Sequence, residues 1–92
     1  MNVRRGGQRR QYALAFGQVL RRLRTEQGLT QEELAFRGGL DRTFPSLLER
    51  GLRTPTLTVI CILAQALQMT PGELVAQAAQ RVREPDAGEA GE

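Results

Sequence analysis

Apolar residues recur along this chain at the spacing of one helix face, and no segment alternates apolar and polar residues with the period of a strand. One such face contains Tyr12, Phe16, Val19, Leu20 and Leu23. The pattern predicts an all-α fold of five helices. The helices are expected at about residues 12–27, 31–37, 42–50, 56–68 and 71–83.

Two capping boxes mark the starts of helices. Thr30 is followed three residues later by Glu33, a pair that satisfies free backbone N–H groups reciprocally. The same spacing separates Thr70 from Glu73. Pro71 then stands at the first position of the last helix, where its missing N–H costs nothing. These signals predict that helices begin directly after both threonines.

The middle helix has a proline near its start. Asp41 is a good N-cap residue for a helix over 42–50, which Gly51 closes. Pro45 is then the fourth helical residue, so it removes the first intrahelical hydrogen bond and biases Phe44 away from α geometry. We therefore expect this helix to start late or to be distorted.

The fourth expected helix is apolar on two faces. Its inner face is expected to contain Leu57, Ile60, Cys61, Ala64 and Leu67. A second stripe contains Val59, Ile62, Ala66 and Met69, and continues on the last helix with Leu74, Val75, Ala78 and Val82. A helix that is apolar on two sides needs a second partner. Either the stripe forms a homodimer interface, or the C-terminal helix of the same chain covers it.

Charge divides the chain into a basic domain and an acidic end. The 92 residues contain 13 arginines, no lysine and 10 acidic residues, and residues 1–83 carry a formal balance of +7. We expect a flexible basic arm over 1–11, one domain over 12–83 and a disordered acidic tail over 84–92. The basic balance indicates either an anionic partner or an ordinary solvated surface.

Several classes of protein are disfavoured. With no histidine and one cysteine, the chain lacks the ligands of a zinc site, and we expect no metal, cofactor or small-molecule ligand. It has no phosphate-cradling glycine loop and no carboxylate pair in an apolar setting, so an enzyme is not expected. No apolar run approaches a membrane span, and no signal peptide is visible. We expect a cytoplasmic protein with Cys61 as a buried structural thiol.

A short helix, a glycine-containing turn and a second short helix are the parts of a helix-turn-helix. Over about residues 13–76 the chain resembles the XRE family of transcriptional regulators, which are Cro- and lambda-repressor-like. The matching segments, in order, are Leu23-Arg24, 28–35 (GLTQEELA), 40–43 (LDRT), 49–51 (ERG), 63–67 (LAQAL) and 70–74 (TPGEL). The resemblance implies a five-helix domain whose helix 42–50 reads the major groove of DNA.

The resemblance also implies roles for individual residues. Arg42, Thr43 and Ser46 are expected to face base edges, with the forked guanidinium of Arg42 suited to guanine. Gln31 is expected to contact a phosphate and brace the recognition helix, and Arg50 to lie along the backbone. Arg24 and Glu49 occupy positions that often form an internal ion pair.

Other candidates depart from the family pattern or have no motif behind them. Leu47 stands where relatives often carry a polar residue, and it is suited to a thymine methyl group. Phe44 replaces a frequent tyrosine and keeps its ring, so it remains a candidate for the DNA backbone. Further candidates for phosphate or minor-groove contacts are Arg53 and the arm residues Arg4, Arg5, Arg9 and Arg10.

The predicted function is a dimeric, sequence-specific regulator of bacterial type that binds double-stranded DNA, as a repressor or autoregulator. Two copies would read a palindromic operator, because a single recognition helix reads too few bases. The alternative is a helix-turn-helix domain that binds a protein through an apolar surface formed by Phe44, Pro45 and Leu47. The salt dependence of binding distinguishes the two hypotheses. Affinity for DNA falls steeply as the salt concentration rises, because phosphate contacts weaken, whereas an apolar protein contact barely responds.

Overall fold

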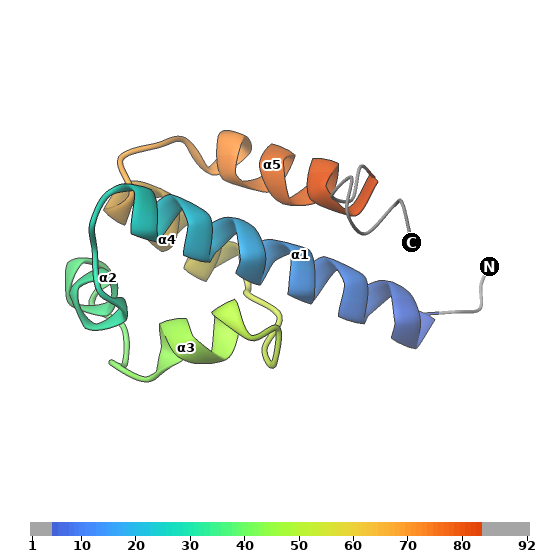
Figure 1. The fold of residues 1–92 in the computed structure, drawn as a ribbon, viewed down its shortest axis with the longest axis horizontal. Helices are drawn as coiled ribbons and strands as arrows, with labels where there is room; N and C mark the ends of the chain where they lie inside the picture. The colour runs from blue at the N-terminus through green and yellow to red at the C-terminus, as the bar shows by residue number, and fades with distance from the viewer. Residues whose placement is uncertain (1–4, 84–92) are drawn as a thin grey trace.

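The computed structural model describes residues 5–83, which form five helices and, over that range, no strand. The helices are α1 (Arg5–Glu26), α2 (Gln31–Gly38), α3 (Phe44–Glu49), α4 (Leu57–Ala66) and α5 (Pro71–Arg83). The long α1 crosses the molecule with α5 on one side and α3 on the other (Figure 1). The prediction of an all-α fold with five helices is confirmed.

Each helix contributes one leucine to a common core. Leu20, Leu34, Leu48, Leu63 and Leu74 come from the five helices in order, and each is 0% exposed. Burying a leucine side chain stabilises a fold by about 1.5–3 kcal/mol. The short helices α2 and α3 are therefore fixed by packing against the longer ones, and not by their own helical propensity.

Both predicted capping boxes are present. The Glu33 amide donates to Oγ1 of Thr30 at 3.0 Å, and the Thr30 amide donates to Oε1 of Glu33 at 2.8 Å. At the start of α5, the Glu73 amide donates to Oγ1 of Thr70 at 3.1 Å, and the Thr70 amide donates to Oε1 of Glu73 at 2.9 Å. Helices α2 and α5 consequently begin where the sequence predicts.

The first helix begins earlier than predicted. Its backbone is helical from Arg5, so residues 5–11 belong to α1 and do not form a flexible arm. Arginine and glutamine are good helix formers, and they extend the helix beyond the part that the core needs. Tyr12 was expected on the inner face but is 53% exposed. The rest of the expected arm and the acidic tail lie outside the described residues.

The fourth helix has a different inner face from the one predicted. Leu57 is 73% exposed and Cys61 is exposed, so neither is a core residue and the thiol is not buried. Leu63, which the prediction omitted, is 0% exposed. The apolar run 59–64 fits more than one helical phase, and contact with the rest of the core selects one that the pattern alone does not identify.

Part of the predicted dimer stripe lies inside the monomer. Ala66, Leu74 and Ala78 are buried in the core, where α4 and α5 pack on the rest of the domain. These three residues are therefore core residues of the monomer and do not belong to an exposed stripe. The other five members keep some exposure: Val59, Ile62, Met69, Val75 and Val82.

No single helix within residues 5–83 is both long and apolar enough to cross a membrane. Helices α4 and α5 meet that test only when taken together, by length and composition, and they are bent by 107° at their junction.

Candidate nucleic-acid interface

Helix α3 is held against α1 by a direct backbone approach at Gly17. A Cβ atom added at Gly17 would lie 2.3 Å from the carbonyl oxygen of Leu48 and 2.7 Å from that of Glu49. Real Cβ atoms do not approach so closely, so only glycine permits this packing. The C-terminal end of α3 is thereby fixed on the surface of α1.

A network of buried polar groups joins the same end of α3 to α1 and α2. Nε and Nη2 of Arg24 donate to the two carboxylate oxygens of Glu49 at 2.6 and 2.9 Å. Nη1 of Arg24 donates to the carbonyl of Leu29 at 2.7 Å, and Nε2 of Gln31 donates to Oε1 of Glu49 at 2.9 Å. The side chains of Arg24 and Glu49 are 11% and 4% exposed. This network sets the angle between the helices of the helix-turn-helix.

The network also fixes the charge state of its cation. Hydrogen bonding to Glu49 is the main cause that raises the pKa of Arg24 above its ordinary value, against the opposing effect of burial. Arg24 is therefore held in its positively charged form, and a buried charge of this kind requires its carboxylate partner.

The turn before α3 differs from the prediction. Asp41 does not cap the helix; its Oδ1 accepts hydrogen bonds from the amide and the hydroxyl of Thr43. The N-cap position belongs to Thr43, whose side chain makes no capping bond. Arg42 and Thr43 consequently lie in the turn and not in the first turn of a helix over 42–50.

Pro45 explains the late start of α3. The helix begins at Phe44, so Pro45 occupies its second position, where a backbone N–H has no intrahelical partner to lose. The expectation of a delayed start is confirmed, and the proline stabilises the start where it lies. Pro45 is also among the fully buried side chains, and Phe44 packs against the core. Pro45 therefore cannot contribute to an apolar surface for protein binding, whereas Phe44 and Leu47 are half-buried.

The carboxyl of Asp41 is electrostatically distinct from an ordinary surface aspartate. Hydrogen bonds from the side chain and the backbone of Thr43 lower the pKa of Asp41, in that order of importance. The carboxylate holds Thr43 in the turn through these two hydrogen bonds. Arg42, between Asp41 and Thr43, points outward and lies beside Glu32 of α2.

Most of the residues predicted to meet DNA line one shallow hollow of about 350 Å³, whereas Phe44 and Arg53 do not. It is lined by Gln31 and Glu32 of α2, by Arg42 and Thr43 of the turn, and by Ser46, Leu47 and Arg50. Donor groups therefore converge with one apolar side chain at the N-terminal half of α3. A surface of this composition matches the donors, acceptors and thymine methyl groups along a major groove.

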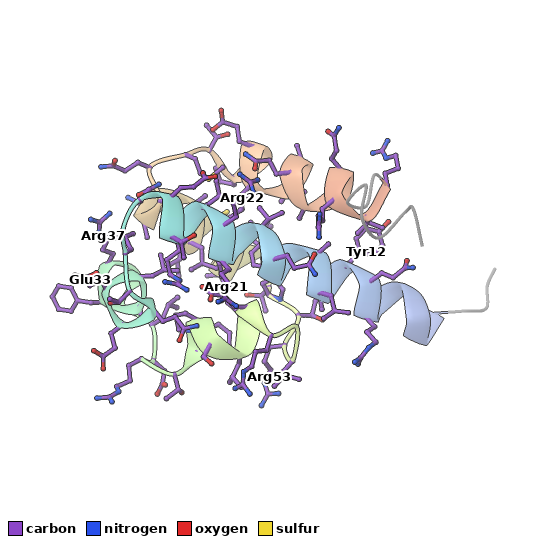
Figure 2. The ribbon with its side chains drawn as sticks, in the orientation of Figure 1. Tyr12, Arg21, Arg22, Glu33, Arg37 and Arg53 are labelled. Atoms are coloured by element: carbon purple, nitrogen blue, oxygen red, sulfur yellow. The ribbon has the colours of Figure 1, made fainter. Side chains whose placement is uncertain are left out.

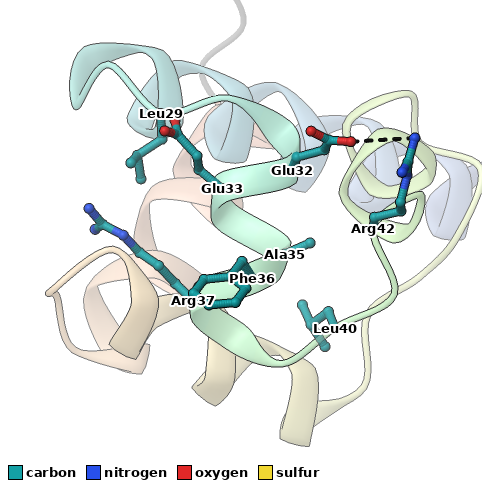
Figure 3. A pocket seen from close by; sticks show the side chains of 8 residues that line it. All are labelled: Leu29, Glu32, Glu33, Ala35, Phe36, Arg37, Leu40 and Arg42. Atoms are coloured by element: carbon teal, nitrogen blue, oxygen red, sulfur yellow. Dashed lines mark ion pairs between the residues drawn. The ribbon is translucent and has the colours of Figure 1, made fainter.

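Arg42 has an acidic neighbour that the sequence prediction missed. Its Nη2 lies 3.4 Å from Oε2 of Glu32, and both side chains are mostly exposed (Figure 3). Exposed ion pairs of this kind contribute about 0–1 kcal/mol, so the pair is easily opened. The pair leaves the guanidinium of Arg42 in solvent at the hollow.

Two further basic candidates follow Leu47: Arg50 lines the hollow, and Arg53 does not. Nε of Arg50 donates to the carbonyl of Ser46 at 3.3 Å, and Nη1 of Arg53 donates to the carbonyl of Leu52 at 3.2 Å. Both side chains are exposed, and Figure 2 shows Arg53 in the loop that follows α3, away from α5. Their charges are thus directed to the α3 side of the molecule.

Gly17 was also missed, although the sequence contains a signal for it. A glycine inside an otherwise apolar and regular helix indicates a close approach of another backbone. Glu32 had no comparable signal, because an exposed glutamate at a helix start is common for reasons of the helix dipole.

A metal site is not among the candidates in the described part of the chain. Over these residues, no three side chains among His, Cys, Asp and Glu gather closely enough to hold an ion.

Comparisons with known proteins agree with this geometry. The helix-turn-helix family HTH_3 matches residues 20–74. The HTH-type transcriptional regulator y4dJ of Sinorhizobium fredii (strain NBRC 101917 / NGR234) is 49% identical over 59 residues, which cover 64% of this chain and 77% of that protein.

Two solved structures of controller proteins are similar in both fold and sequence. The restriction-modification controller protein C.AhdI from Aeromonas hydrophila is 52% identical with a TM-score of 0.66, covering 67% of this chain and 94% of that one. The restriction-modification controller protein C.Esp1396I, solved as a tetramer with its natural 35 base-pair operator, is 26% identical with a TM-score of 0.72, covering 79% and 96%. This chain therefore belongs to the helix-turn-helix family of XRE-type, Cro- and lambda-repressor-like transcriptional regulators.

Proposed function

We propose that this protein is a sequence-specific transcriptional regulator that binds double-stranded DNA as a homodimer. The observation that carries the proposal is the convergence of Arg42, Ser46 and Leu47 on one hollow beside the N-terminus of α2. The operator complex of C.Esp1396I supports it, because that protein shares the fold and presents it to DNA.

Each group at the hollow has a chemically suitable partner in a major groove. The fork of Arg42 matches the two acceptors of guanine, and the hydroxyls of Thr43 and Ser46 suit several base edges. Leu47 is half-buried and suits the methyl group of thymine. The groups assigned to the sugar-phosphate backbone are Gln31, Phe44, Arg50 and Arg53.

The buried network gives this surface its precision. Gln31 contacts Glu49 and also lines the hollow, so the residue assigned to a phosphate is held by the same carboxylate that fixes α3 on α1. A phosphate bound at Gln31 would therefore set the register of α3 relative to the bases.

The homodimer interface is assigned to the outer surface of α4 and α5. The predicted residues that retain exposure there are Val59, Ile62, Met69, Val75 and Val82. To these we add Leu57, whose side chain is 73% exposed at the start of α4. A symmetric dimer would place two copies of α3 about 34 Å apart, as reading of an inverted repeat requires.

The similarity to C.AhdI supports a role as a repressor or an autoregulator. Such a regulator acts on bacterial DNA, so we assign the protein to the cytoplasm.

The test is selection of duplexes from a random pool, followed by titration of the enriched duplex and a scrambled one at 50 and 200 mM salt. We expect an inverted repeat that binds about 10³-fold or more tightly than the scramble. We also expect both affinities to fall with salt. Equal affinity for the two duplexes would overturn sequence-specific binding.

A further inference from the structure

Two exposed arginines lie at and just after the end of α3, and a third lies on α1, beyond the contacts of that helix with the end of α3. Arg50 closes α3, Arg53 follows in the loop, and Arg10 lies on α1. We call these three residues the arginine rim. Arg10 is 40 residues from Arg50 in the sequence, so the fold brings α1 to the edge of the molecule that holds the end of α3.

The position of Arg10 follows from two contacts of α1. A Cβ at Gly51 would lie 2.6 Å from Cδ2 of Leu14, and Gly17 approaches the last carbonyls of α3. Arg10 precedes Leu14 by four residues and Gly17 by seven, so helical periodicity places all three on one face. Arg10 is thus on the face of α1 that meets α3, one turn beyond the last contact.

The rim carries charge that no carboxylate in the described part of the chain neutralises. The ion pairs of this part involve Arg22, Arg24 and Arg42. Arg50 and Arg53 donate only to main-chain carbonyls. Unneutralised arginines clustered at one edge are suited to a polyanion, because each guanidinium binds a phosphate group in a forked geometry.

The dimensions of DNA match this arrangement. Seven helical residues separate Arg10 from Gly17 by about 10 Å along α1. The major groove is about 12 Å wide. When the end of α3 lies in the groove, a cation about 10 Å away from that end can therefore reach the phosphate backbone that borders the groove. Arg53 lies in the loop that follows α3, on the α3 side of the molecule (Figure 2).

We propose that Arg10, together with Arg53, binds the phosphate backbone flanking the half-site, so that the N-terminal turns of α1 form a second anchor on DNA. The inference rests on the proposed function and extends it to a segment outside the residues 20–74 that the family covers. The contact is to phosphate only, so it adds affinity equally on every sequence.

The test compares Arg10→Gln with the matched control Arg83→Gln. Arg83 is also an exposed helical arginine, but it lies at the end of α5, on the other side of α1 from α3 (Figure 1). Binding is measured by fluorescence anisotropy on the selected duplex and on a scrambled duplex of equal length, between 50 and 200 mM salt. Circular dichroism melting checks that both variants are folded.

We expect Arg10→Gln to make the slope of log affinity against log salt shallower by about 0.9 per protomer, equally on both duplexes. Trimming the flanks of the selected duplex should remove the difference between Arg10→Gln and the wild type. Arg83→Gln should keep the wild-type slope. An unchanged slope for Arg10→Gln, or an equal change for Arg83→Gln, overturns the anchor while leaving the proposed function intact. If the wild type binds neither duplex, both proposals fail.

Discussion

Arg24 of α1 spans both carboxylate oxygens of Glu49 at the end of α3, with donor–acceptor distances of 2.6 and 2.9 Å. Both side chains are almost entirely removed from solvent. A forked, buried pair of this kind has one favourable geometry, so it fixes the direction of α3 more than it adds to the free energy of unfolding.

Removing one partner of this pair should strongly destabilise the fold. We expect Glu49→Ala to lower the free energy of unfolding by about 3–5 kcal/mol, because Arg24 is left as an unpaired buried charge. Glu26→Ala, which removes the exposed partner of Arg22, should cost at most about 1 kcal/mol. Urea unfolding measures both values. Similar losses for the two variants would show that the buried pair has no special role.

Gly17→Ala should destabilise the protein although alanine is the better helix former. The gain in helix propensity is about 1 kcal/mol at most, whereas overpacking costs about 1–3 kcal/mol. Here the added methyl group would press on backbone carbonyls at 2.3 and 2.7 Å, which have no rotamer to change. The control is Gly72→Ala in α5, where a Cβ meets only Oγ1 of Thr70 at 4.0 Å. Thermal melting should show a lower midpoint for the first variant and no decrease for the second.

Arg42→Ala should weaken binding to the selected duplex by about 1–3 kcal/mol and relax the preference at one base pair of each half-site. Arg53 is assigned to a phosphate contact, so Arg53→Ala should weaken binding evenly on all sequences. Titration of a set of single-base operator variants distinguishes the two patterns. If Arg42→Ala loses affinity evenly across the set, Arg42 is a phosphate contact and not a base reader.

Leu57→Glu should convert the dimer to a monomer without unfolding it. The side chain is 73% exposed in the monomer, and a negative charge at the start of α4 is compatible with the helix dipole. Phe36→Glu on α2, at an 87% exposed position, is the control and should remain dimeric. Sedimentation velocity reports both states. A dimer that survives Leu57→Glu would remove the start of α4 from the interface.

Asp41 should titrate below the usual range of an aspartate. Because the pKa is lowered in the folded protein, its contribution to stability is present above the unfolded-state pKa and is lost as the pH falls through the folded-state value. Thr43→Val removes the hydroxyl, which is the largest cause, and should raise the pKa toward its ordinary value. Carboxyl chemical shifts followed by NMR measure this change, and an identical titration in Thr43→Val would contradict the assignment.

Local signals in the sequence predicted some features of the fold better than others. The boxes at Thr30 and Thr70 depend on neighbours three residues apart, so the sequence specifies them fully. The choice between Cys61 and Leu63 as core residues depends on packing against other helices, and a continuous apolar run contains no information on that choice. The start of α3 was half predicted: Pro45 indicated the delay, but the Asp41–Thr43 turn that accompanies it was not foreseen.

The residues that hold the end of α3 at Gly17 largely differ from the residues that line the hollow. The placement of α3 depends on Gly17, Arg24 and Glu49, none of which lines the hollow beside α2, and Gln31 links the two groups of residues. Arg42, Ser46 and Arg50 line that hollow but contribute nothing to the core. Under the proposed function, exchanging these side chains would change the operator preference on an unchanged scaffold.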